Sequence, residues 1–338
     1  MLATRLSTKC HVSRSRRVLL GMACAIVGMA AGGAWAQGYP ERPVTMIVPF
    51  NAGGAADATG RIVGEALSRE LGANVVIENV GGAGGALGTT RVKTAEPNGY
   101  VIGLGHMGTL AAAVPLNPSL KYDPRTDFEY LGLISTSPNV LYVRKNHPAK
   151  TLREFIAYAK GPNGAPSMGH GGIGAASHVT CVMLFKLAGV EPNLVPYKGF
   201  GQTVSDILAE RIDGGCDLLA SVASQAKSGN LRILAVAADN RSPLLPDAPS
   251  SAEAGLPEFK TETWTGLFVA KGTPAPIVER LRTAIAKVLK DDGVRQKLAA
   301  IGAVVPPEGQ QGGAYMADLI GKEVGSWSRI LAGIKADE

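Results

Sequence analysis

The chain repeats one pattern, in which a short apolar run is followed by a glycine-rich loop and then by an amphipathic stretch. Its clearest copy begins with the β-branched run Val44–Val48, which lacks polar alternation and therefore predicts a buried parallel strand. A loop with Gly53 and Gly54 follows, and apolar residues then recur at helical spacing over 57–71, until Gly72 closes the predicted helix. Such repeated units predict an α/β fold built on mainly parallel sheets.

The same pattern continues along the chain. Further strands are predicted at 75–77, 100–104, 140–143, 167–168, 194–196, 215–219, 231–236 and 267–270, and further helices at 86–95, 152–159, 176–187, 202–209, 277–289, 292–301 and 314–334. The three C-terminal helices need a partner surface, and the simplest arrangement returns them to the first strands. We therefore expect two lobes, 37–141 with 263–338 and 142–262, with ligand sites at the carboxyl ends of the strands.

The net charge of +6 belongs to the N-terminal segment. Residues 1–36 hold five of the 34 basic residues and none of the 28 acidic ones, which leaves 29 basic against 28 acidic residues. A basic stretch ending at Arg17, an apolar stretch and the small residues of Ala34-Trp35-Ala36 predict a secretory signal cleaved after Ala36 and a periplasmic protein. Arg16-Arg17 leaves twin-arginine export open beside the general secretory route. The mature chain has no reason from its charge to bind nucleic acid.

Cysteines and histidines give no metal signature. An oxidising compartment permits a disulfide between Cys181 and Cys216, but a single pair is no scaffold device, so the sequence favours two buried small hydrophobic residues. The histidines that follow residue 36 are scattered along the chain, and His170 and His178 are too far apart to share a helical face at one turn. We expect no metal and no cofactor.

Three glycine-rich loops follow predicted strands, at 51–56, 81–85 and 169–175, and each leads into a helix. Glycines let the backbone approach a ligand closely, and the free N–H groups of a helix N-terminus favour an anion. None of the loops has the lysine and Ser/Thr of a phosphate-binding loop or a convincing dinucleotide spacing. The pattern therefore favours a small carboxylate over a nucleotide.

Enzymatic alternatives have less support. Ser177 and His178 are neighbours at a predicted helix start, so their side chains point apart, and no Gly-x-Ser-x-Gly motif occurs. Asp57 fits an acidic residue in the first turn of a helix better than it fits a general base. Asp213 and Asp217 flank a predicted strand on the same side, which leaves a carboxylate pair open, although surface turn residues are commoner. We expect a binding protein and not an enzyme.

Many ordered motifs resemble those of the extracytoplasmic solute receptors of tripartite tricarboxylate transporters, also called Bug proteins. They include Val48-Pro49-Phe50-Asn51-Ala52-Gly53-Gly54, Tyr122-Asp123-Pro124, Val195-Pro196-Tyr197-Lys198-Gly199 and Gly272-Thr273-Pro274. The resemblance covers nearly all of the chain after residue 36. It implies a monomeric, two-lobed Venus-flytrap receptor of the type II-like periplasmic binding-protein class. Such a receptor captures a small carboxylate between its lobes and delivers it to membrane transporter subunits.

The resemblance also implies a site, in which backbone N–H groups of the loops hold the carboxylate. Carried onto this sequence, the first lobe supplies Asn51, Ala52, Gly53, Gly54 and Asp57, and the second supplies Gly174, Ala175, Ala176, Ser177 and His178. We add His106, Met107, Tyr197, Phe200 and Asp217 as further candidate ligand-binding residues.

Several candidate positions depart from the family pattern. Ala175 and Ala176 stand where the family usually has Ser or Thr, His106-Met107 stands where small hydroxyl residues are common, and Phe200 replaces a small residue. If these side chains face the cleft, they predict a ligand with one carboxylate and an apolar or aromatic body. Di- or tricarboxylates and amino acids remain alternative ligands, and presenting a ligand to a periplasmic sensing system remains an alternative function.

Overall fold

The computed structural model describes residues 38–162 and 165–332, and the elements below lie in one compact unit, Pro40–Glu338. The predicted secretory signal and its cleavage site lie outside the described residues. Within the described ranges, no helix combines the length and the apolar character that crossing a lipid bilayer requires.

The first sheet contains β1 (Val44–Val48), β2 (Val75–Asn79), β3 (Val101–His106), β9 (Glu262–Ala270) and the first part of β4 (Phe128–Arg144). Strand β1 pairs in parallel with β2 and β3, whereas β9 runs antiparallel between β3 and β4. The second sheet contains the rest of β4 with β5 (Ser167–His170), β6 (Asn193–Pro196), β7 (Gly214–Leu218) and β8 (Leu231–Val236). Its strands β6, β5 and β7 are parallel, and β7 and β8 pair antiparallel with β4.

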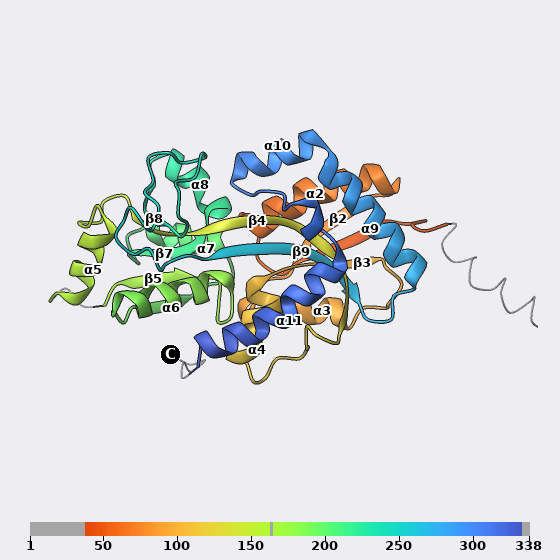
Figure 1. Cartoon of the computed structure of the whole chain (residues 1–338), viewed down its shortest axis with the longest axis horizontal. Helices are drawn as coiled ribbons and strands as arrows, with labels where there is room; N and C mark the ends of the chain where they lie inside the picture. The colour runs from red at the N-terminus through yellow and green to blue at the C-terminus, as the bar shows by residue number, and fades with distance from the viewer. Residues whose placement is uncertain (1–37, 163–164, 333–338) are drawn as a thin grey trace, which may run out of the picture. The chain divides into compact units, whose positions relative to one another are not determined.

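Strand β4 belongs to both sheets and joins them (Figure 1). Its pairing passes from β9 at Pro138 to β7 at Asn139. The sequence predicted only residues 140–143 of this strand, because Pro138 and Gly132 lie inside it and both are uncommon in strand interiors. Gly132 occupies an irregular point of the β4–β9 register, where a Cβ would lie 2.1 Å from the carbonyl oxygen of Gln311. The lobe boundaries at 141 and 262 stay a prediction.

Helices cover both faces of the first sheet (Figure 1). On one side, α2 (Ala55–Leu71) packs with α9 (Ala275–Lys290) and α10 (Asp292–Ile301). On the other side lie α3 (Ala86–Lys93), the π-helical turn η2 (Gly108–Ala112), α4 (Ala113–Leu116) and α11 (Gly313–Ile330). Two short 3₁₀ turns complete this half, η1 (Ala83–Gly85) and η3 (Glu308–Gln310).

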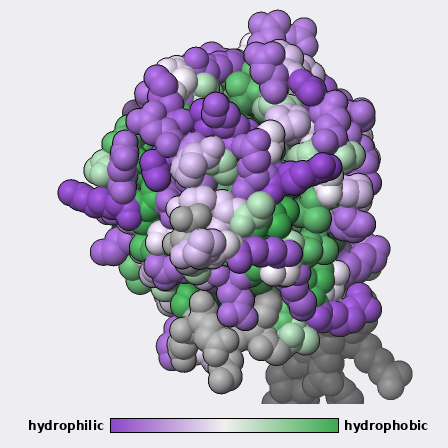
Figure 2. Space-filling view, turned by 90° about the vertical axis from the view of Figure 1, so that its left-hand side faces the viewer, coloured by the Kyte–Doolittle hydropathy of each residue, from purple (hydrophilic) through white to green (hydrophobic). Residues whose placement is uncertain are grey.

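The second sheet carries α5 (Leu152–Lys160), α6 (Ala176–Ala188), α7 (Phe200–Leu208) and α8 (Leu219–Lys227). Seen from the side of α5 and β8, the surface is mainly hydrophilic with apolar side chains between the polar ones (Figure 2). Helix α8 was not predicted from the sequence, because this helix follows β7 without a loop. Strand and helix therefore form one continuous apolar run around Leu218.

The two remaining cysteines are paired, which makes the expectation of two unpaired residues wrong. A disulfide joins Cys181 of α6 to Cys216 of β7, with 5.4 Å between the Cα atoms. Both residues are buried in the core of the second sheet, as expected of small hydrophobic side chains. They are 35 residues apart, so only the packing of α6 on β7 brings them within bonding range.

Candidate functional site

A cavity of about 50 Å³ lies where loops from the two sheets meet. Its walls come from the carboxyl ends of β1, β3, β5 and β7 and from the first turns of α2, α6 and α8. The lining residues are Phe50, Asn51, Gly54, Ala55, Ala56, His106, Gly171, Ala175, Ala176, Ser177, Gly199, Phe200, Asp217, Leu218, Ser221 and Thr265. This is where an open α/β fold is expected to bind a ligand.

The structure places the predicted site residues in three settings. Those that line the cavity are Asn51, Gly54, His106, Ala175, Ala176, Ser177, Phe200 and Asp217. Those that belong to the same loops without lining it are Ala52, Gly53, Asp57, Met107, Gly174 and His178. Tyr197 lines a different, larger pocket. Their roles in ligand binding stay a prediction.

Half of the lining residues were not among the candidate site residues. Ala55, Ala56 and Gly171 nevertheless lie inside the predicted loops 51–56 and 169–175, and Phe50 and Gly199 belong to motifs on which the family resemblance rests. Leu218 is the last residue of β7, Ser221 comes from the unpredicted α8, and Thr265 comes from the early part of β9. A helix predicted directly after the strand at 215–219 would have pointed to Ser221.

The N-terminus of α2 is held by Asp57. Gly53 adopts a φ of 96°, which lets the loop turn back so that its N–H donates to Asp57 Oδ2 at 3.1 Å. Asn79 donates to Oδ1 at 3.1 Å, and Arg61 pairs with the same oxygen at 2.9 Å. Burial by itself would raise the pKa of Asp57, but the hydrogen bonds from Arg61, Gly53 and Asn79 lower it below its usual value. An ionised carboxylate therefore stands at this helix end.

The N-terminus of α6 has the same construction with a neutral residue. Gly174 has a φ of 80°, and its N–H donates to His178 Nδ1 at 3.3 Å, again over four residues. Ser177 Oγ accepts from the Gly171 N–H at 2.9 Å. Burial lowers the pKa of His178 to about 3, and the neighbouring His170 lowers it further, so His178 is neutral at pH 7. Because Nδ1 accepts, its proton is on Nε2.

The fold brings together two histidines that look scattered in the sequence. The rings of His170, at the end of β5, and His178, in α6, lie 4.7 Å apart between centroids. His170 Nδ1 accepts from the Gly172 N–H at 3.2 Å, and burial lowers its pKa to about 4. Both rings therefore brace the 171–174 loop. Among the described residues, no group of three His, Cys, Asp or Glu side chains is placed to hold a metal ion.

The cavity lining contains two titratable side chains, His106 and Asp217, and no lysine or arginine. His106 stacks on Phe50 with 5.1 Å between ring centroids, and its Nδ1 accepts from the Gly108 N–H at 2.9 Å. Burial lowers the pKa of His106 to about 4, so the ring is neutral with its proton on Nε2. Within the lining, Asp217 is then the one side chain that can carry a charge at pH 7.

Asp217 is set apart from Asp213, so the carboxylate pair left open by the sequence does not form. Asp213 accepts from the Ser167 N–H at 2.9 Å and faces Arg144 at 3.7 Å. Asp217 Oδ1 accepts from the Leu218 N–H at 2.7 Å and from Ser221 Oγ at 3.0 Å. Burial raises the pKa of Asp217 to about 6, although these two hydrogen bonds oppose the rise.

The two halves of the cavity wall touch each other directly. The Ala55 N–H of α2 donates to Ser221 Oγ of α8 at 3.0 Å, and the Asn51 N–H donates to the Lys198 carbonyl at 3.2 Å. At Gly84, which has a φ of 62°, a Cβ would lie 2.0 Å from the Ile173 carbonyl oxygen. Loops of the first and second sheets therefore meet backbone to backbone beside the cavity.

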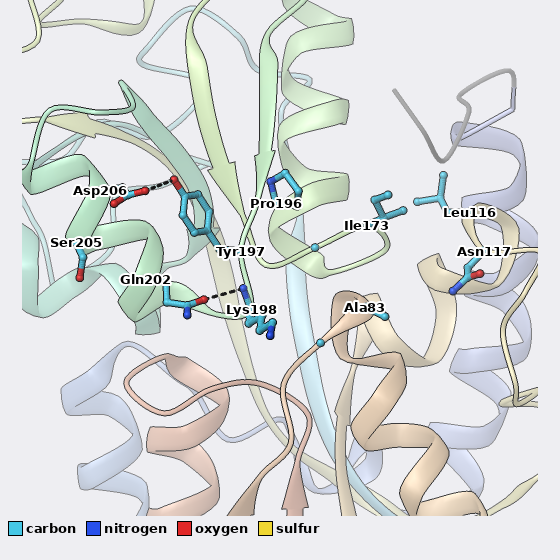
Figure 3. Close-up of a pocket in the computed structure, with 12 residues that line it drawn as sticks. Ala83, Leu116, Asn117, Ile173, Pro196, Tyr197, Lys198, Gln202, Ser205 and Asp206 are labelled. Carbon is cyan, nitrogen blue, oxygen red and sulfur yellow. Dashed lines mark hydrogen bonds between the residues drawn. The ribbon is translucent and has the colours of Figure 1, made fainter.

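A larger pocket of about 810 Å³ lies outside this contact. Figure 3 shows Ala83, Leu116 and Asn117 on one side of it and Tyr197, Gln202, Ser205 and Asp206 on the other. The Tyr197 hydroxyl donates to Asp206 at 2.8 Å, and the Lys198 N–H donates to Gln202 at 3.1 Å. These groups satisfy each other, and the lining does not include the first turns of α2 and α6.

Comparisons with known proteins identify the family of this chain. A family model described as the tripartite tricarboxylate transporter family receptor matches residues 59–335. Protein BugT of Bordetella pertussis is 32% identical over 93% of this chain and 95% of its own length. An Agrobacterium vitis protein encoded in the ttuE–ttuC′ intergenic region is 39% identical over 79% of this chain and 77% of its own.

Solved structures show the same fold. MatC of Rhodopseudomonas palustris, solved with bound malate, is 37% identical and covers 87% of this chain and 100% of its own, with a TM-score of 0.83. A second R. palustris protein, solved with adipate, is 31% identical over 87% of this chain and 97% of its own, with a TM-score of 0.82. The two-lobed periplasmic binding-protein architecture and the family match together show that the chain belongs to the receptors of the tripartite tricarboxylate transporter family, a class of solute-binding proteins.

Proposed function

We propose that the protein is a periplasmic receptor that closes on a small carboxylate and delivers it to membrane subunits of a tripartite tricarboxylate-type transporter. The ligand carboxylate binds at the N-terminus of α6, and no catalysis takes place. The protein acts as a monomer after removal of the leader at Ala36 by signal peptidase.

One observation supports this proposal: the first turn of α6 faces the cavity and, unlike that of α2, contains no acidic side chain. The first N–H groups of a helix lack intrahelical acceptors, and the helix end carries a partial positive charge. At α2 the same charge is balanced by ionised Asp57, and the Ala55 N–H is already bound by Ser221. At α6 the matching residue is neutral His178. A ligand carboxylate supplies the missing negative charge.

The rest of the lining describes the body of the ligand. Phe50, Ala175, Ala176, Phe200 and Leu218 make several walls apolar, in line with the departures from the family pattern. The small volume of the cavity, about 50 Å³, disfavours a bulky ligand body.

Two relatives support the ligand class. MatC was solved with malate and the second R. palustris protein with adipate, and both ligands are small aliphatic dicarboxylates. Both structures share the fold of this chain at more than 30% identity.

Thermal unfolding of the chain lacking residues 1–36 tests the proposal, after refolding to remove any co-purified ligand. The panel contains short aliphatic acids, aromatic acids, amino acids and the neutral amide of each acid. A bound acid at a hundred times its Kd should stabilise the fold by about 2.7 kcal/mol, and its amide should not. Stabilisation by amides as large as that by acids would refute an anion site. Turnover of any panel member would refute the receptor role.

A further inference from the structure

The cavity contains a negative group that the binding of a carboxylate does not explain. Asp217 lines the same space as the first turns of α2 and α6. Its burial raises its pKa to about 6, so it is mostly ionised at neutral pH. A receptor for anions therefore places its own anion inside the site, which disfavours any ligand with negative charge at both ends.

The two carboxylate oxygens of Asp217 differ in their hydrogen bonds. Oδ1 accepts from the Leu218 N–H and from Ser221 Oγ, and Ser221 in turn accepts from the Ala55 N–H of α2. This oxygen therefore takes part in the contact that closes the two halves of the wall. Among the described residues, none donates a hydrogen bond to Oδ2, which leaves this oxygen as an acceptor for a bound molecule.

Within the cavity lining, no lysine or arginine competes for that acceptor. The other titratable side chain of the lining, His106, is neutral, because burial lowers its pKa. Tyr142 packs against Phe200 with 6.1 Å between ring centroids, and both burial and the charge of Asp217 raise its pKa, so it stays protonated. The site therefore has an anion-binding end at α6 and an acceptor end at Asp217.

Resting on the proposed function, we propose that Asp217 determines specificity: Oδ2 selects carboxylates that carry a hydrogen-bond donor, an ammonium or hydroxyl group, and rejects those that carry a second carboxylate. The ligand is then a short amino acid or hydroxy acid with one carboxylate, bound with its carboxylate at α6 and its donor at Asp217. A site built around a buried acceptor loses affinity for an analogue without the donor, because the acceptor then stays unpaired.

The substitution Asp217→Asn tests this assignment with little change in shape. The amide oxygen replaces Oδ1 and keeps the bonds from Leu218 and Ser221, while the amide NH₂ replaces Oδ2 and presents a donor to the cavity. The surface substitution Asp239→Asn is the matched control, because Asp239 is exposed and pairs only with Lys260.

The probes are butanoate, its 2-, 3- and 4-hydroxy and amino derivatives, and succinate, measured by calorimetry at pH 7.5. We expect wild type and Asp239→Asn to bind at least one hydroxy or amino acid ten- to a hundredfold more tightly than butanoate and succinate. Asp217→Asn should lose that preference and gain at least tenfold for succinate relative to wild type.

Two kinds of outcome overturn the inference. One leaves the proposed carboxylate receptor intact, and the other contradicts it as well. If wild type binds succinate as tightly as the donor-bearing acids, or if Asp217→Asn keeps the wild-type ranking, Asp217 is not the specificity determinant, while the carboxylate receptor stands. If neither protein binds any of the acids although both are folded by circular dichroism, the proposed carboxylate site fails together with the inference.

Discussion

The N-termini of α2 and α6 share one backbone design and differ in charge. Each begins after a glycine with positive φ, Gly53 or Gly174, whose N–H donates to the third residue of the helix. That residue is ionised Asp57 in α2 and neutral His178 in α6. One side chain therefore decides whether a helix end is balanced within the protein or remains able to bind a ligand anion.

The largest effect is expected from removing the disulfide, which fixes α6 covalently while α2 has no such link among the described residues. Cys181→Ala with Cys216→Ala should lower the free energy of unfolding by about 3–4 kcal/mol, the chain-entropy value for a loop of 35 residues. Urea unfolding of both proteins measures the loss. A reductant should destabilise wild type and leave the double variant unchanged; equal stability of the two proteins would contradict the structure.

Placing an acid at the third position of α6, as in α2, should remove the ability of this helix end to bind a ligand anion. His178→Asp places a carboxylate at the third helical position, where it satisfies the Gly174 N–H and balances the helix end. The affinity for the best acid of the panel should fall about a hundredfold, because the ligand carboxylate then meets a like charge. His178→Asn keeps a neutral acceptor and is the control. Unchanged affinity in His178→Asp would place the carboxylate elsewhere.

Separating the two loops should weaken binding by about tenfold. In Gly84→Ala the added Cβ meets the Ile173 carbonyl, and the residue keeps an unfavourable positive φ. The form in which the two loops touch therefore becomes less stable relative to the open form. Gly321→Ala in α11 is the control, because a Cβ there meets nothing within 4 Å. Affinities of both variants and of wild type, measured by calorimetry, test this prediction. A Gly84→Ala protein that binds as tightly as wild type would show that this loop contact is not needed for binding.

A difference in acid sensitivity is also expected. The pKa of His178 falls from 6.5 in the unfolded chain to about 3 in the fold, so its contribution to stability is complete above pH 6.5 and is lost as the pH falls. His178→Gln should reduce the fall in unfolding free energy between pH 6 and 4.5 by about 1.4 kcal/mol per pH unit. Asp57→Asn should leave that slope unchanged, because the lowered pKa of Asp57 acts below 3.8. Equal slopes for His178→Gln and wild type would contradict the burial of this ring.

Local sequence signals were sufficient for most elements and for the site loops. Gly72 ends α2 in the left-handed conformation with its N–H on the Ser68 carbonyl, as the pattern predicts. The glycine loops after β1 and β5 do line the cavity. Strand β4 was largely missed, because Gly132 and Pro138 break a strand pattern that long-range pairing with β9 and β7 maintains.

The missed part of the site has a different cause. Ser221 lies in a helix that follows β7 without any loop, and its contact with Ala55 spans 166 residues. Cys181 with Cys216, and His170 with His178, likewise meet only once α6 packs on the second sheet. Such contacts leave no periodicity in the sequence.

The sequence was sufficient for the α/β class and the family, and it predicts an anion-binding character for the loops, because glycine turns and helix starts are set by a few neighbouring residues. Only the tertiary structure decided which helix end is left without an acid, which carboxylate lies inside the cavity and how the halves of its wall meet. Those properties depend on burial and on side chains from distant segments, which fix the charge of His178 and of Asp217.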